Sequence, residues 1–167
     1  MMLISEKLNQ AMNEQIGNEF AASMQYLAIA AFFETHHMAL MSKLFFEQAE
    51  EEKEHAMKFV HYVLETSGDL RIPQIKAPKP TFESAAEAVE AALNWELEVT
   101  QQINNLMDIA VSEKDYLARG MLQWFVEEQL EEINKMERLL TVIRRAGDNN
   151  LLMVEAYLIH TGDDLED

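Results

Sequence analysis

The sequence contains no cysteine. Disulfides, zinc ribbons, cysteine-ligated iron–sulfur clusters and thiol catalysis are therefore excluded, and any bound metal must use oxygen and imidazole ligands. No apolar stretch approaches the ~18 to 20 residues that a membrane span requires, so we expect a soluble protein without a membrane partner. Residues 1–7 offer neither a basic start nor an apolar signal core, which predicts cytoplasmic residence.

Basic residues are also scarce. Thirteen Lys and Arg stand against 30 Asp and Glu, which gives a formal net charge of −17. Such a charge repels nucleic acid and anionic lipid and attracts cations, so we expect metal ions as partners and no nucleic acid. An acidic surface that merely serves solubility is the alternative explanation.

Glycine and proline are few, and all three prolines lie within residues 72–81. The remainder predicts an all-α protein with helices at about 5–35, 39–67, 83–111, 115–146 and 148–160. At 167 residues we expect a single domain over 1–167, made of a bundle at about 5–146 and a short fifth helix. Gly68 and Gly147 fall at expected helix ends, and Ser84 with Glu87 matches a capping box.

The links between the helices predict the topology. The links near 35–38 and 112–114 are tight, so the helices that they join should be antiparallel neighbours. The link at 68–81 has ~14 residues and can reach ~45 Å, whereas a helix of ~28 residues is ~42 Å long. The link can therefore cross the whole bundle, and we expect the second and third helices to run parallel.

Each of the four long helices carries a core seam, a set of residues at alternating steps of four and three that share one buried stripe. Each seam is apolar at its ends and polar in its middle. The polar centres are Glu19, then Glu52 and His55, then Glu96, then Gln129 and Glu132. Their distances from the tight links are similar, ~14 to 18 residues, so the six side chains should meet at one depth in the core.

A lone Glu in a core register often reaches solvent, and a lone His is often an ordinary hydrogen-bonded core residue. Four carboxylates buried together are different, because each unpaired charge costs several kcal/mol unless cations neutralise it. Carboxylates with one imidazole suit Fe(II), Mn(II) or Zn(II), and two ions that share one carboxylate would use this set economically. Tyr26 adds a redox-active phenol on the same face as Glu19.

With these residues, the sequence resembles the haem-free prokaryotic ferritin family over nearly its whole length. The resemblance is carried by Asn18–Phe20 with Tyr26, by Gln48–His55, by Trp95–Glu96 and by Gln123–Glu132. The family fold is a ferritin-like four-helix bundle whose di-iron pattern has one Glu on each of two helices and Glu-x-x-His on each of the other two. The fourth helix departs from that pattern, since Gln129 and Glu132 replace Glu-x-x-His.

The resemblance implies the ligand sets. Glu19, Glu52 and His55 would hold the first iron, and Glu52, Glu96 and Glu132 would hold the second, with Glu52 bridging and Gln129 beside the pair. Prokaryotic ferritins carry a third iron site, and the matching residues are Glu51, Glu128 and Glu131, with help from Glu132. These three lie off the seam, so a solvated acidic helix face is the alternative.

Related families fit less well. Bacterioferritins have the same kind of bundle, with His in the second motif and a Met that ligates haem. In this sequence Glu132 and Lys53 stand at those places, so no haem is expected. Rubrerythrins need a cysteine-bound iron domain, which a chain without cysteine cannot build. The miniature DNA-protection ferritins place their irons between subunits, and their motif does not match.

The fifth helix is apolar around most of its circumference, at Leu151–Val154 and Tyr157–Ile159. Because four helices already close a core, we expect this surface to bury against other subunits. The resemblance implies a homo-oligomeric shell of 24 subunits. A lid or a membrane role is the alternative.

The resulting functional prediction is an iron-storage ferroxidase. It would oxidise Fe(II) with O2 at the di-iron centre within each subunit and store ferric oxyhydroxide in the shell, and Tyr26 and Trp124 would buffer single-electron steps. One alternative is a di-iron oxidase of an organic substrate. Another is a structural or metal-buffering bundle without oxidation.

Overall fold

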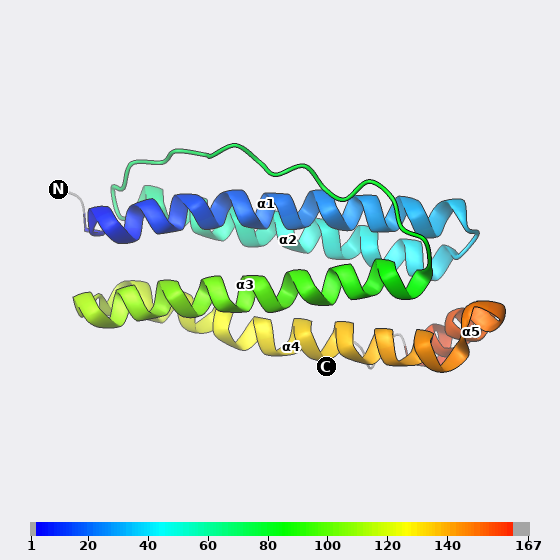
Figure 1. The fold of residues 1–167 in the computed structure, drawn as a ribbon. Coiled ribbons are helices and arrows are strands. Elements are labelled where there is room, and N and C mark those ends of the chain that lie inside the picture. Colours follow the sequence, from blue (N-terminus) through cyan, green and yellow to red (C-terminus); the bar gives the residue numbers. More distant parts are fainter. Residues whose placement is uncertain (1–2, 162–167) are drawn as a thin grey trace.

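Four long helices lie side by side, and a short fifth helix sits at one end of them (Figure 1). The structure is a computed structural model that describes residues 3–161. Its helices are α1 (Glu6–Thr35), α2 (Ala39–Glu65), α3 (Ala85–Glu113), α4 (Tyr116–Ala146) and α5 (Leu151–Thr161), with a 3-10 turn, η1 (Asp148–Asn150), before α5. The all-α class is confirmed, and the long helices begin and end close to the predicted residues.

The segment between α2 and α3 runs along the length of the bundle, over α1 and α2 (Figure 1). It returns the chain to the end where α2 began, so α2 and α3 run in the same direction, as predicted. The tight links make α1 and α2, and likewise α3 and α4, antiparallel pairs. Within residues 3–161, no helix combines the length and the apolarity that crossing a membrane demands.

Side chains of α1 hold this crossover in place. The Asn13 amide donates to the Asp69 carbonyl oxygen over 2.8 Å, and its Oδ1 accepts from the Arg71 backbone N–H over 2.8 Å. Farther along, Gln25 Oε1 accepts from the Lys79 backbone N–H over 2.8 Å. Gly17 leaves no room for a Cβ atom, because Pro73 occupies that space. The crossover is therefore docked against α1.

The helix ends differ in detail from the expectations. Ser84 Oγ accepts from the Glu87 N–H over 3.1 Å, but the Glu87 carboxylate accepts from the Glu83 N–H and not from that of Ser84, so only half of the capping box forms. After α2, the left-handed residue is Ser67, with φ 57°, and not Gly68. Gly68 follows it because a Cβ there would collide with Asn9. Gly147 ends α4 with φ 69°, as predicted for a glycine stop.

One side of α5 packs on its own subunit, against α4 and α2, through the buried Val154 and Leu158. On the other side, Leu152, Met153 and Ile159 are 65% to 79% exposed. The Glu155 carboxylate accepts hydrogen bonds from the Leu40 and Met41 N–H groups, each over 3.0 Å. The α2 N-cap residue supplies no side-chain bond of its own, so α5 caps α2.

The core is apolar at both ends and polar in the middle, as the seams predict. One apolar cluster, around Phe33 and Phe45, includes the buried residues of α5. The other, around Phe59 and Phe125, lies toward the opposite end. Between them lies a layer of buried polar side chains, among them Gln15, Glu19, Gln48, Glu52, His55, Glu96, Gln129 and Glu132.

Candidate metal centre

The predicted seam residues converge in two groups that share one carboxylate. Ligand atoms of Glu19, Glu52 and His55 lie within 4.8 Å of one another, and so do those of Glu52, Glu96 and Glu132. All five residues are at most 2% exposed. We call the two groups the first and the second position. Glu52 belongs to both, so it is placed to bridge two ions.

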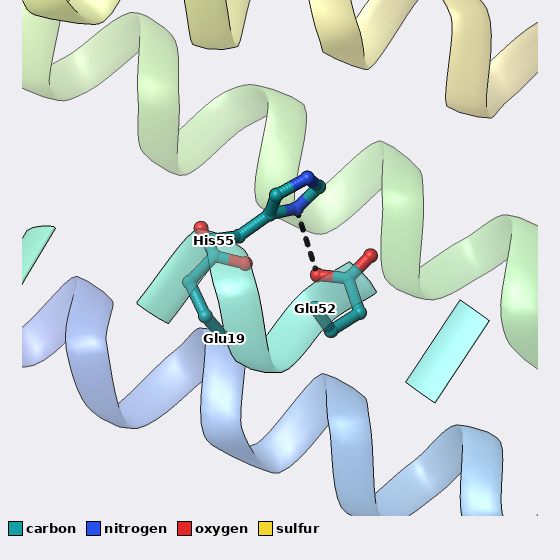
Figure 2. Close-up of side chains that lie close together, drawn as sticks. All are labelled: Glu19, Glu52 and His55. Carbon is teal, nitrogen blue, oxygen red and sulfur yellow. Dashed lines mark hydrogen bonds and ion pairs between the residues drawn. The ribbon is translucent and has the colours of Figure 1, made fainter. Parts of the chain in front are cut away.

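The first position lies entirely on α1 and α2, as Figure 2 shows. Glu19 Oε1 accepts from the Gln15 amide over 2.9 Å, and His55 Nδ1 lies 3.3 Å from Glu52 Oε2. The other oxygens, Glu19 Oε2 and Glu52 Oε1, are buried and have no hydrogen-bond partner. Buried carboxylate oxygens without a donor are costly, and a bound cation would satisfy both.

The second position differs, because donors of the protein already engage its outer carboxylates. Glu96 Oε1 accepts from the Tyr26 hydroxyl, and Glu96 Oε2 accepts from the Gln129 amide over 3.1 Å. Glu132 Oε2 accepts from the Gln48 amide over 2.6 Å, and Glu132 Oε1 lies 3.8 Å from Lys135 Nζ. An ion that binds here must displace at least some of these donors.

Burial and mutual repulsion raise the pKa of all four carboxyl groups. Burial first, and then the charge of Glu52, raises the pKa of Glu19 from 4.5 to about 8. Burial first, and then the charge of Glu132, raises the pKa of Glu52 to about 8. Burial likewise raises the pKa of Glu96 and of Glu132. The metal-free centre therefore retains protons near neutral pH, which a binding cation would release.

A third group forms beside the pair, with a different membership from the expected one. Glu51, His55 and Glu128 come within 4.8 Å of one another, and Glu51 and Glu128 are partly exposed. Glu131, the third expected residue, is exposed and lies outside this group. Burial raises the pKa of Glu128, while the nearby His55 opposes this shift.

Two aromatic side chains flank the centre. Tyr26 is fully buried at the second position. The Trp124 ring lies edge-on to His55 with 5.4 Å between ring centroids, and Lys58 Nζ lies 3.8 Å from its centroid. Both residues are thus near the predicted iron pair.

Some functional neighbours were not assigned roles from the sequence. Gln15 and Gln48 stand on the seams next to the predicted ligands, so their spacing could have suggested that they donate to them. Lys135 lies off the seam, and the only indication in the sequence was its position three residues after Glu132, on the same face of the helix. Thr100, which accepts from the Gln129 amide over 3.3 Å, gave none.

Comparisons with known proteins place the chain in a family. Residues 9–146 match the family model described as a ferritin-like domain. The chain is 39% identical over 143 residues to ferritin BfrB of Mycobacterium tuberculosis, covering 86% of this chain and 79% of that protein. It is 32% identical over 148 residues to the bacterial non-heme ferritin of Staphylococcus aureus, covering 89% of each.

A solved structure is similar over nearly the whole chain. It is the open pore ferritin from the hyperthermophilic archaeon Archaeoglobus fulgidus, with a TM-score of 0.90 and 32% sequence identity. The match covers 95% of this chain and 98% of that one.

Proposed function

The chain belongs to the ferritin family, and from this premise we propose that it stores iron after oxidising Fe(II) with O2 at the two positions described above. The observation that carries the proposal is the pair of three-ligand groups joined through Glu52. Oxygen donors with a single imidazole match the ligand preference of Fe(II). Iron is here the substrate.

The residues divide the work as follows. Glu19 and His55 bind one Fe(II), Glu96 and Glu132 bind the other, and Glu52 holds both at a short separation. Two Fe(II) then supply two electrons, which reduce one O2 to the level of peroxide and leave two Fe(III). The carboxyl groups release their protons as the ions bind, because the cations favour the ionised forms. Tyr26 and Trp124 are placed to supply a single electron when only one iron is oxidised.

Glu51 and Glu128 give the product a path away from the pair. They adjoin His55 and are partly open to solvent, so a ferric ion that leaves the first position meets acidic ligands next. We propose that Glu51, Glu128 and the exposed Glu131 pass iron to the storage cavity, where ferric oxyhydroxide grows.

Storage requires an enclosed space, which one subunit does not supply. We propose a homo-oligomeric shell of 24 subunits, supported by the apolar residues that α5 exposes at Leu152, Met153 and Ile159. Particle mass by light scattering, with electron microscopy, tests this proposal. Monomers or dimers alone at micromolar concentration would refute the shell.

The oxidation is tested by mixing metal-free protein anaerobically with two Fe(II) per subunit and then with O2, while ferric absorbance is followed. Wild type should show a rapid first phase. Glu52→Ala should abolish it, because both positions lose a ligand. Glu54→Ala is the matched control, since Glu54 is an exposed acid on the same helix, and it should behave like wild type. A rapid phase that survives Glu52→Ala contradicts the proposed centre.

The two alternative functions predict other products. A metal-buffering bundle would bind Fe(II) without producing the ferric absorbance. A di-iron oxidase of organic substrates would need a pocket beside the ions, and a groove of about 350 Å³ between α3 and α4 does reach Gln129 and Thr100. For such an oxidase, iron would remain bound at two per subunit, whereas a store continues to take up iron beyond that number.

A further inference from the structure

Lys135 lies beside the second position in an unusual setting for a lysine. Its Nζ atom is 3.8 Å from Glu132 Oε1 on its own helix and 3.6 Å from Glu51 Oε2 on α2. The side chain is 18% exposed, whereas that of Lys43, which pairs with one glutamate on the surface of α2, is 70% exposed. Holding a long cationic side chain in this way loses rotamer freedom and hydration, so the contacts must compensate for it.

The two positions are unequal because of these contacts. In the first position, Glu19 Oε2 and Glu52 Oε1 have no hydrogen-bond partner, so an ion that binds to them displaces no donor of the protein. In the second position, Glu132 meets Lys135 at Oε1 and the Gln48 amide at Oε2. An ammonium that lies against Glu132 repels a divalent cation that binds to the same carboxylate. Withdrawal of Lys135 would therefore favour binding of an ion in the second position.

We propose that Lys135 is a displaceable counter-ion of the second position. It neutralises Glu132 and Glu51 while no metal is present, swings toward solvent when an ion binds, and makes the two positions fill in order, the first before the second. The length of the lysine side chain permits this movement without a change in α4. The identity of the natural ion rests on the proposed function, but the order of filling does not.

An ordinary interhelical ion pair is the competing explanation of the same contacts. In that case Lys135 would stabilise the packing of α4 on α2 and would not affect metal affinity. The two explanations predict different results when the charge is removed and the side-chain length is kept.

The test is an anaerobic titration of the metal-free, full-length protein with Co(II), followed by visible absorbance. Co(II) takes similar ligands to Fe(II) and does not depend on oxidation. Wild type should bind two ions per subunit in two steps. Lys135→Met should tighten the second step by about tenfold, because one opposing unit charge is removed. Lys135→Arg, which keeps the charge, and Lys43→Met, which removes a distant one, should match wild type.

Several outcomes would overturn the proposal. These are a second step that is unchanged or weaker in Lys135→Met, equal tightening in Lys43→Met, or a single step in wild type. If Lys135→Met does not fold, Lys135→Gln takes its place with the same expectation. A wild type that binds Co(II) in order but fails to oxidise Fe(II) would refute the proposed function and leave the role of Lys135 standing.

Discussion

The Tyr26 hydroxyl on α1 donates a hydrogen bond to Oε1 of Glu96 on α3. Both side chains are at most 1% exposed. The Gln129 amide engages the other oxygen of Glu96, so this carboxyl group is fully satisfied by the protein. Glu19 has only Gln15 as a donor and keeps one oxygen free. Two carboxyl groups of equal burial therefore have different effects on the stability of the metal-free protein.

Replacing Glu19 by Leu should stabilise the metal-free protein. The change removes a buried carboxyl group that Glu52 repels, and it continues an apolar seam. We expect the free energy of unfolding to rise by about 1 kcal/mol or more, and the first phase of Fe(II) oxidation to be lost. Denaturation in the presence of a chelator and stopped-flow oxidation measure the two effects. A variant that unfolds earlier yet oxidises Fe(II) at the wild-type rate would make Glu19 an ordinary structural residue.

Glu96→Leu is the comparison that uses the Tyr26 contact. It also removes a buried carboxyl group, but it leaves the Tyr26 hydroxyl without an acceptor, at a cost of about 1 to 3 kcal/mol, and it takes from the Gln129 amide one of its acceptors, leaving Thr100 Oγ1 and the backbone carbonyl of residue 96. Glu19→Leu removes only the one hydrogen bond that Glu19 accepts from the Gln15 amide. We therefore expect the gain in stability to be smaller than for Glu19→Leu, or reversed. Equal gains in the two variants would contradict the role given to the Tyr26 hydrogen bond.

The metal-free protein should lose stability as the pH rises from about 5 to 8. The pKa of Glu19 and of Glu52 is about 8 in the folded protein, against 4.5 ordinarily, so the folded state holds more protons in this range. The contribution of these two groups to the free energy of unfolding is then fully present below about pH 4.5 and is lost as the pH passes through 8. We expect a total change on the order of 1 kcal/mol or more. Denaturation at fixed protein concentration measures it.

Glu19→Gln with Glu52→Gln is the control for this pH dependence. Neither amide titrates, so the slope between pH 5 and 8 should flatten. An unchanged slope in the double variant would mean that other groups cause the pH dependence.

The third group should affect later turnovers more than the first. Glu51→Gln with Glu128→Gln should leave the initial oxidation of two Fe(II) per subunit and slow the following additions, because these residues lie beside the pair without forming it. Repeated additions of Fe(II), followed by ferric absorbance, measure this. Glu131→Gln should have a smaller effect, since Glu131 lies outside the group. Loss of the first oxidation event would contradict this assignment.

Glu155 should stabilise the first turn of α2. Its carboxylate accepts from two N–H groups at a helix N-terminus, where a negative charge is favourable. We expect Glu155→Gln to cost about 1 kcal/mol and to speed hydrogen exchange at Leu40 and Met41. Glu65→Gln, at the other end of α2, should be neutral or slightly stabilising because a negative charge is unfavourable there. Similar losses in both variants would exclude a capping effect.

The sequence predicted the helices and the shared level of the polar residues because both depend on local spacing. Glu19 and Glu52 stand at similar distances from one tight link, and an antiparallel pair must then bring them together. The same reasoning extends to Gln15 and Gln48, which occupy seam positions. Helix periodicity and link length were sufficient for this part of the structure.

The remaining features depend on directions that spacing does not specify. Lys135 reaches Glu51 through a long side chain, and His55 joins Glu128 through the orientation of its ring. Asn13 and Gln25 anchor the crossover. Predicting this role would require knowing which face of α1 the crossover covers. Ser67 takes the left-handed conformation usually expected of a glycine such as its neighbour Gly68.

All residues of the first position lie on the hairpin of α1 and α2, whereas the second position also needs α3 and α4. During synthesis, Glu19, Glu52 and His55 join the growing chain before residue 96 is added. Lys135 follows later still, in the second half of α4. The growing chain thus contains the first position, with its unpartnered carboxylate oxygens, before it contains Lys135. The lysine that neutralises Glu132 is added only with the last long helix.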